Sequence, residues 1–158
     1  MLRDPALIPL SRQHQHALAL CVRIDRSLKA GIAEVDVWQP EIEEQFQQEI
    51  RYHFDAEESV LFPIAERTED LMALTSELRA EHVALRRYFA LAAARAMSIV
   101  DLHEFSVTLT RHIRKEEREL FERLQRILTP EELVELGVQL DAAILNATHS
   151  CALPKQKR

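Results

Sequence analysis

The chain has 158 residues and a formal net charge of −6, and its length is enough for one hydrophobic core, so we expect a single domain over residues 1–158. Only two glycines are present, aromatic residues make up 6% of the chain, and Ala, Leu, Glu, Gln and Arg are common, which favours an all-α fold over strands joined by tight turns. The negative charge disfavours a nucleic-acid partner, because no basic stripe is present apart from the short basic tail "PKQKR".

The termini and cysteines exclude other classes of protein. The apolar run in "MLRDPALIPL" is short and broken by Pro5 and Pro9, so it does not resemble a signal peptide. No segment approaches the roughly 20 apolar residues of a membrane span. Cys21 and Cys151 lie far apart and form no CxxC pair, which disfavours a disulfide framework and a thiolate metal site, and we interpret Cys21 as a small core residue. We therefore expect a cytoplasmic protein with no membrane partner.

Two helices are predicted in the first half of the chain. The first should begin with Ser11 as its N-cap and run to about Ala30, where Gly31 ends it. The second should begin near Pro40, which suits a first helical turn, and kink or end near Pro63. The expected inward residues are Leu7, Leu10, His14, Ala17 or Leu18, Cys21, Ile24 and Leu28 on the first helix, and Ile42, Phe46, Ile50, His53, Glu57, Val60 or Leu61, and Ile64 on the second.

Two more long helices follow, over about residues 69–97 and 100–128. Their expected inward residues are Leu71, Leu74, Leu78, His82, Leu85, Phe89 and Ala92, and then Phe105, Leu109, His112, Glu116, Leu120, Leu124 and Ile127. Four long helices with short connections favour an antiparallel up-down four-helix bundle, over about residues 7–128.

A short fifth helix is predicted over about residues 130–148. It follows "TPEE", in which a threonine N-cap precedes proline and two acids in the first turn. We expect its apolar stripe to cap the end of the bundle, with a dimer surface as the alternative. The stripe consists of Leu133, Leu136, Leu140 and Ile144.

The chain repeats itself. "HFDAEESVLF" (53–62) and "HIRKEERELF" (112–121) share a histidine, a doubled glutamate four residues later, and a closing Leu-Phe. Aligning "LSRQHQ" (10–15) with "LRAEHV" (78–83) pairs His14 with His82 in the same way. Each half is therefore one helix with a single inward histidine followed by one helix with HxxxEE, which predicts a pseudo-twofold bundle.

The repeated residues suit a metal site. Residues i and i+4 of a helix share a face, so each HxxxE pair presents an imidazole and a carboxylate in one direction. Left without partners in a core, such groups would cost on the order of several kcal/mol each. Imidazole with carboxylate suits iron, zinc or manganese, and two shared carboxylates suggest a bridged metal pair. The predicted ligands are His14, His53, Glu57, His82, His112 and Glu116.

These residues resemble the hemerythrin-like family, also called the HHE cation-binding domain. The resemblance is carried by His14, "HFDAEE", "EH" with His82, and "HIRKEE", over about residues 7–127. It implies a four-helix bundle with a non-haem di-iron centre of two irons per chain. The resemblance also implies that histidines are terminal ligands, that Glu57 and Glu116 bridge the irons, and that an oxo or hydroxo group bridges them too. Zinc is the alternative metal.

The chain departs from the oxygen-carrying hemerythrins. Arg86 stands where the carriers have a second histidine, and Glu116 follows His112 by four residues where they have Asp at five. With four histidines, two bridging carboxylates and one bridging oxygen, each octahedral iron keeps one open position. We therefore expect a protein that senses or reacts with dioxygen, peroxide or nitric oxide, or reports iron status. An adaptor bundle holding zinc for stability only is the alternative, and enzyme activity stays open.

Several nearby residues have alternative interpretations. His14 and His16 compete for the inward position of the first helix, and the helical register favours His14. Glu58 and Glu117 are expected to be solvated neighbours or hydrogen-bond acceptors behind the ligands, with entry into an open metal position as the alternative. Arg86 is expected to be a helix-surface arginine rather than an anion lure. A small diatomic or peroxide ligand and a homodimer or another protein are the expected partners. His103 and His149 are expected at the surface.

Overall fold

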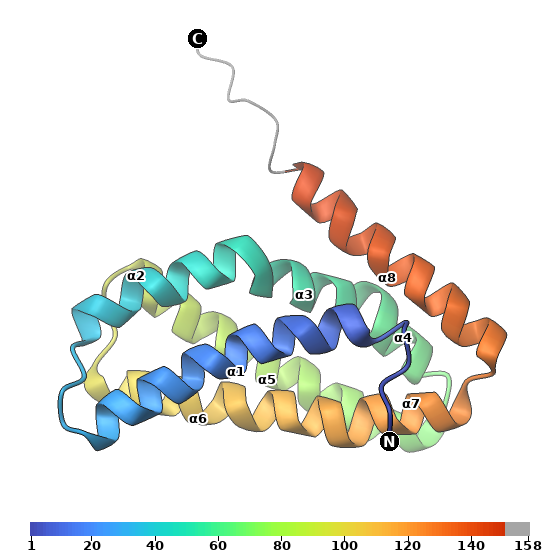
Figure 1. Cartoon of the computed structure of the whole chain (residues 1–158), viewed down its shortest axis with the longest axis horizontal. Helices are drawn as coiled ribbons and strands as arrows, with labels where there is room; N and C mark the ends of the chain where they lie inside the picture. The colour runs from blue at the N-terminus through green and yellow to red at the C-terminus, as the bar shows by residue number, and fades with distance from the viewer. Residues whose placement is uncertain (151–158) are drawn as a thin grey trace, which may run out of the picture.

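The computed structural model describes the backbone of residues 1–150 and the side chains of residues 1–145. Four long helical stretches run antiparallel, and a fifth helix crosses one end of them (Figure 1). No strand occurs within residues 1–150, so the predicted all-α bundle is confirmed. The stretches are α1 (Ile8–Lys29); α2 (Val35–Gln45), η1 (Phe46–Ile50), α3 (Arg51–Ala56), η2 (Glu57–Leu61) and α4 (Phe62–Ala65); α5 (Glu69–Ala93); and α6 (Ile99–Lys115), η3 (Glu116–Leu120) and α7 (Phe121–Ile127), where η denotes a π-helical turn.

The first helix begins earlier than predicted. It starts at Ile8 with Pro9 in its first turn, so the assignment of Ser11 as N-cap was wrong. The Ser11 hydroxyl instead donates a hydrogen bond to Glu117 Oε1 at 2.7 Å. The predicted end is confirmed, because Gly31 has a φ of 69° and its N–H donates to the Leu28 carbonyl at 3.1 Å. Glycine reaches this left-handed conformation without the steric cost of a Cβ.

The second helix also begins before its predicted start. It starts at Val35, and Pro40 lies inside α2, so the start at Pro40 was wrong. Val35 and Trp38 pack against the core, which stabilises the extra turn. Proline there removes one backbone hydrogen bond from the helix. Pro63 lies in the last turn of this stretch, which ends at Ala65 close to the predicted end.

The third helix is shorter than predicted. It ends at Ala93 rather than Met97, because Arg95 adopts a φ of 56° and reverses the chain direction. The fourth helix then begins with a capping box in which Ser98 Oγ accepts from the Asp101 N–H at 3.0 Å. The Asp101 carboxylate accepts from the Ser98 N–H at 2.8 Å in return.

One predicted inward position, Ile127, is displaced by one residue, and another, Ile64, packs against the core but is incompletely buried. Ile127 was expected to be buried but is 44% exposed, while Leu128 packs against the core. Ile64 is only half-buried, and Ala65 next to it is fully buried. Both positions follow a π-helical turn, which holds one residue more than an α-turn and shifts the phase of the helix beyond it.

The fifth helix, α8 (Pro130–Ser150), covers the end of the bundle. Leu136 and Leu140 are fully buried in a core cluster with Leu7, Leu10 and Phe62. A Cβ on Gly137 would lie 3.2 Å from Ala6 Cα, so the helix passes close to the N-terminal segment. The predicted capping role is therefore confirmed, on a helix longer than expected. The basic tail and Cys151 lie outside the described residues, as does the side chain of His149.

Packing of α8 predicts an asymmetric mutational response along the helix. Leu136→Ala should lower the free energy of unfolding by about 2–5 kcal/mol, because it leaves a cavity in a closed core. Val134→Ala, at a residue 69% exposed on the same helix, should change it by less than about 0.5 kcal/mol. Urea unfolding followed by circular dichroism measures both. Equal effects would show that α8 does not pack on the bundle in solution.

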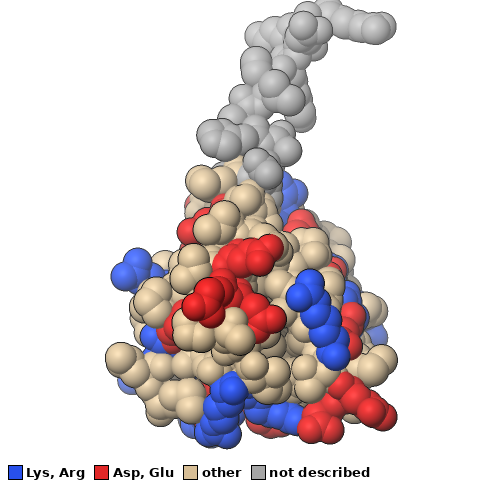
Figure 2. Space-filling view, turned by 90° about the vertical axis from the view of Figure 1, so that its right-hand side faces the viewer, with Lys and Arg blue, Asp and Glu red and all other residues tan. Residues whose placement is uncertain are grey.

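The surface is of mixed charge where α8 begins. Figure 2 shows Asp and Glu side chains beside Lys and Arg side chains at this end of the molecule. Among the residues that the structure describes, no helix is both long enough and apolar enough to cross a membrane. His103 is exposed, as predicted.

Candidate metal centre

All six residues predicted as ligands lie together in the middle of the bundle. Each comes from one of the four long helical stretches, and each side chain is almost completely buried. They are His14 (α1), His53 (α3), Glu57 (η2), His82 (α5), His112 (α6) and Glu116 (η3). His16, the competitor of His14, is 65% exposed and pairs with Glu49, so it lies outside the cluster.

The cluster divides into two groups that share both glutamates. The first position is formed by His14 and His53, and the second position by His82 and His112. At each position, the two imidazoles and one oxygen from each of Glu57 and Glu116 lie within 4.8 Å of one another. Each position therefore presents two nitrogens and two oxygens to one point.

The carboxylates span the two positions. Glu57 Oε1 lies 3.0 Å from His53 Nε2, and its other oxygen, Oε2, lies 3.3 Å from His82 Nε2. Glu116 also spans both positions: its Oε2 lies 3.1 Å from His14 Nε2, and its Oε1 lies 3.3 Å from His112 Nε2. One oxygen of each carboxylate thus faces each position, which is the arrangement of a bridging carboxylate.

The Leu-Phe that closes each repeat also has a place in the site. A π-helical turn begins at Glu57, in η2, and another at Glu116, in η3, and each turn is followed by a buried phenylalanine. The Phe121 ring centroid lies 5.5 Å from that of His14, and the Phe62 centroid lies 5.5 Å from that of His82. Two apolar rings therefore cover equivalent histidines and limit the access of water to them.

The second glutamate of each HxxxEE motif contacts a histidine of the opposite half of the chain. His14 Nδ1 lies 2.7 Å from Glu117 Oε1, and His82 Nδ1 lies 2.7 Å from Glu58 Oε1. An ionised carboxylate only accepts hydrogen bonds, so each Nδ1 carries a proton, and Nε2 is the ring nitrogen that faces the centre and would bind a metal there after losing its own proton. The expected role of Glu58 and Glu117 as acceptors behind the ligands agrees with these contacts.

Sequence analysis missed the acceptors of the other two histidines. His53 Nδ1 donates to Gln13 Oε1 at 2.8 Å, and His112 Nδ1 donates to Glu81 Oε2 at 2.8 Å. Gln13 and Glu81 each directly precede an inward histidine, so they occupy equivalent places in the internal repeat. The alignment of the two halves contained this signal, although the residue types differ.

Arg86 holds the acceptor of His82 in place. Its Nη1 donates to Glu58 Oε1 at 2.6 Å, and its guanidinium lies 5.3 Å from the centroid of the Phe54 ring. Phe54 in turn stacks on His82 with ring centroids 3.8 Å apart. Arg86 is 34% exposed, so the expectation of a helix-surface arginine is correct in part, but its head group is engaged in supporting the site.

An N-terminal arginine plays the same part at the first position. Arg3 Nη2 lies 2.5 Å from Glu117 Oε2, and its guanidinium lies 5.2 Å from the Phe121 ring centroid. Arg3 also donates to Gln125 Oε1 at 3.0 Å, which fixes the N-terminal segment against α7. Each of the two carboxylates that accept from His14 and His82 is therefore paired with an arginine.

The buried glutamates of the cluster favour positive charge on the histidines beside them. Burial by itself would lower the pKa of His14, but the carboxylates of Glu116 and Glu117 outweigh it and raise that pKa to about 10. Burial would also lower the pKa of His82, but the carboxylates of Glu57 and Glu58 outweigh this effect and raise that pKa to about 9. The hydrogen bond from His82 is the main cause that lowers the pKa of Glu58 to about 2.

The pKa values of two further carboxyl groups, Glu57 and Glu81, are lowered in the same way as that of Glu58. Burial would raise the pKa of Glu57, yet His53 and His82 hold it well below its usual range. Burial is likewise outweighed at Glu81 by His112 and Lys115, which lower its pKa to about 2. Glu57, Glu58 and Glu81 are therefore ionised at neutral pH.

The donor set fits a pair of metal cations. Both carboxylate oxygens of Glu57 and of Glu116 are fully buried and have no hydrogen-bond partner among the described residues. The Nε2 atoms of His14 and His53 lie 2.9 Å apart, and those of His82 and His112 lie 3.1 Å apart. Such a concentration of acceptors is costly in a core unless a cation lies between them.

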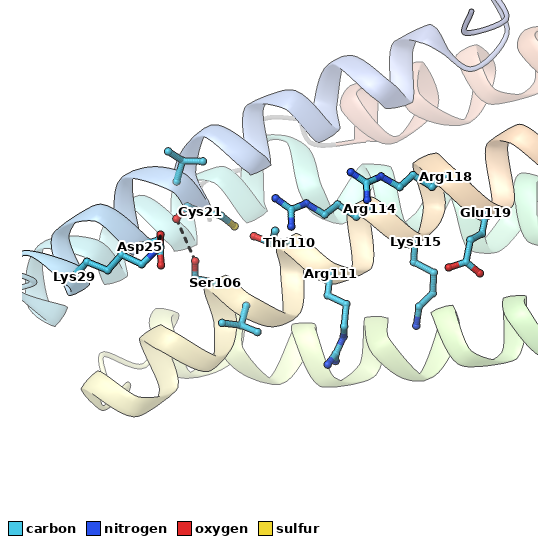
Figure 3. Close-up of a pocket in the computed structure, with 12 residues that line it drawn as sticks. Cys21, Asp25, Lys29, Ser106, Thr110, Arg111, Arg114, Lys115, Arg118 and Glu119 are labelled. Atoms are coloured by element: carbon cyan, nitrogen blue, oxygen red, sulfur yellow. Dashed lines mark hydrogen bonds and ion pairs between the residues drawn. The ribbon is translucent and has the colours of Figure 1, made fainter. Parts of the chain in front are cut away.

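A separate groove lies on the surface between α1 and α6 (Figure 3). Its volume is about 600 Å³, and none of the six cluster residues lines it. Cys21 lies at this groove but is only 2% exposed, and burial raises the pKa of its thiol to about 11. The interpretation of Cys21 as a core residue is confirmed.

Comparison with known families agrees with this site. The model of the hemerythrin HHE cation-binding domain matches residues 9–124, which is more than half of the chain and includes all six cluster residues. No curated protein and no solved structure matches the chain. The resemblance noted in the sequence is confirmed, and the chain belongs to the hemerythrin HHE cation-binding domain family.

Proposed function

We propose that this protein binds two iron ions in its bundle and uses them to sense or react with dioxygen, peroxide or nitric oxide, or to report iron status. His14 and His53 would hold the ion of the first position, and His82 and His112 the ion of the second. Glu57 and Glu116 would bridge the two ions. Bound iron would supply reversible one-electron chemistry and affinity for small diatomic ligands.

The orientation of the two shared carboxylates carries this proposal. Each directs one oxygen to each position, and neither has a hydrogen-bond partner within residues 1–145. Imidazole and carboxylate together suit iron, zinc and manganese better than calcium or magnesium. Bridging carboxylates in a helical bundle are typical of di-iron and di-manganese proteins.

The surroundings of the first position favour a small ligand. A cavity of about 10 Å³ lies against His14 and His53, with Ile50 and Leu109 among its lining residues. This volume admits about one water-sized molecule. Its small volume would exclude larger substrates, which supports a diatomic molecule or peroxide as the partner.

Metal content and redox response test the proposal together. Protein purified aerobically, or reconstituted with Fe²⁺, should contain about two irons per chain and show a near-ultraviolet charge-transfer band. That band should change on reduction with dithionite or exposure to nitric oxide. A zinc-loaded protein with no redox response would support the alternative of a structural adaptor. A chain that takes up no metal under either condition would refute both.

A further inference from the structure

We infer that the two metal positions hold their ions unequally, and that the first position, at His14 and His53, is the exchangeable one. The inference rests on the proposed function and concerns the residues behind the ligands. It follows first from a chemical difference between the two halves of the pseudo-twofold site, in the groups that accept hydrogen bonds from His53 and His112.

Most of the site is symmetric between the two halves. His14 and His82 each contact a carboxylate of the opposite half at 2.7 Å. An arginine pairs with each of those carboxylates. The bridging glutamates begin equivalent π-helical turns. These parts give no reason for the two positions to differ in affinity.

The symmetry is broken at Gln13 and Glu81. Both accept from a histidine Nδ1 at 2.8 Å, but Gln13 offers a neutral amide oxygen to His53, whereas Glu81 offers a carboxylate to His112. Hydrogen bonds to an ionised acceptor are roughly twice as strong as neutral ones. Such a bond makes the imidazole more basic and a better metal ligand. His112 should therefore bind its ion more tightly than His53.

The packing around the two positions also favours tighter binding at the second position. Glu81 is fixed from behind by Lys115, whose Nζ lies 2.6 Å from Glu81 Oε1. Fixed acceptors keep the imidazole oriented toward the metal. At the second position, the His82 ring also lies between Phe54 and Phe62, with centroid distances of 3.8 and 5.5 Å. The second position is therefore the more rigid and enclosed of the two.

The first position is the more accessible. Gln13 is half-buried, and it lines the small cavity beside the bundle core together with both histidines of the first position. Only His112 of the second position reaches that cavity. A weaker ligand beside a cavity offers a path by which an ion leaves or a small ligand enters. An exchangeable first position suits a protein whose loading reports the supply of metal.

Chelator-driven release of iron tests the inference in the full-length protein. The chain is loaded anaerobically with Fe²⁺ to saturation and mixed with an excess of a coloured ferrous chelator. We expect release in two phases of equal amplitude whose rates differ by about tenfold or more, the range expected for a change of acceptor behind a ligand. Mössbauer spectra of ⁵⁷Fe-loaded protein should show the loss of one iron signal before the other.

Two substitutions assign the phases. Gln13→Glu should slow the fast phase about tenfold and leave the slow phase unchanged, whereas Glu81→Gln should accelerate the slow phase by a similar factor. Gln15→Glu adds the same charge at an exposed place on α1 and should alter neither phase. Glu77→Gln removes an exposed carboxylate that also pairs with Lys115, and is the matched control for Glu81.

The wild-type protein alone can overturn the inference. If it binds two irons and releases both in a single phase, the positions are equivalent, and the proposed function stands without the inference. Unchanged release rates in Gln13→Glu would also overturn the inference, because the acceptor behind His53 would then not determine how tightly the first position holds its ion. If the wild-type chain binds no iron, the proposed function fails and the inference fails with it.

Discussion

Glu116→Ala is expected to abolish binding at both metal positions. Glu116 is fully buried and directs one carboxylate oxygen to each position, so its removal takes one ligand from each ion at once. Loss of an acceptor behind a ligand already lowers metal affinity by roughly 10–100-fold, and loss of a shared ligand should exceed that range. Elemental analysis after dialysis against trace metal should find less than about one tenth of the wild-type content.

A neighbouring glutamate provides the control. Glu119 lies in the same π-helical turn as Glu116, but its side chain is exposed. Glu119→Ala should keep the wild-type metal content and melting temperature. His103→Ala, at an exposed histidine of α6, should behave in the same way. Full metal occupancy in Glu116→Ala would contradict the assignment of Glu116 as a bridging ligand.

Removal of the metals is expected to lower the melting temperature by on the order of 10 °C. A ligand that binds only the folded state, at about 1,000 times its dissociation constant, contributes about 4 kcal/mol of stability. For a chain of this size, each 1 kcal/mol shifts the melting temperature by roughly 2–4 °C. Thermal unfolding followed by circular dichroism, with and without a chelator, measures the shift.

Two controls show whether the shift in melting temperature comes from the metals: addition of Fe²⁺ to the stripped protein, and the Glu116→Ala variant. Addition of Fe²⁺ to the stripped protein should restore the original melting temperature. The Glu116→Ala protein should show no dependence on chelator or on added metal. An unchanged melting temperature in the stripped wild-type protein would mean that metal binding is not coupled to the stability of the bundle.

The sequence predicted the cluster because its residues obey one simple rule. His53 and Glu57 lie one helical turn apart, and their equivalents His112 and Glu116 repeat that spacing in a second amphipathic helix. The inward positions of His14 and His82 follow from the register of the apolar residues around them. The burial of these side chains could be predicted because the spacing of the apolar residues shows which face of each helix points inward.

Other features depend on information that periodicity does not contain. The π-helical turns η2 and η3 arise from a change in backbone hydrogen bonding; beyond η3 the inward position moves from Ile127 to Leu128, and beyond η2 Ile64 is only half-buried. The start at Val35 depends on packing against distant helices, which overrides the preference of Pro40 for a first turn. Gln13 was missed because a neutral amide next to a histidine has no charge signature.

The exchange of acceptors between the halves has a consequence for how the site assembles. His14 depends on Glu117 and His82 depends on Glu58, so each half of the chain completes the other. A fragment ending in the connection after Ala65 would carry both histidines of the first position but would lack the carboxylate that orients His14. Two such fragments, however, could supply Glu58 to one another around a true twofold axis. The architecture is therefore that of two interlocked copies of one unit joined by a single connection.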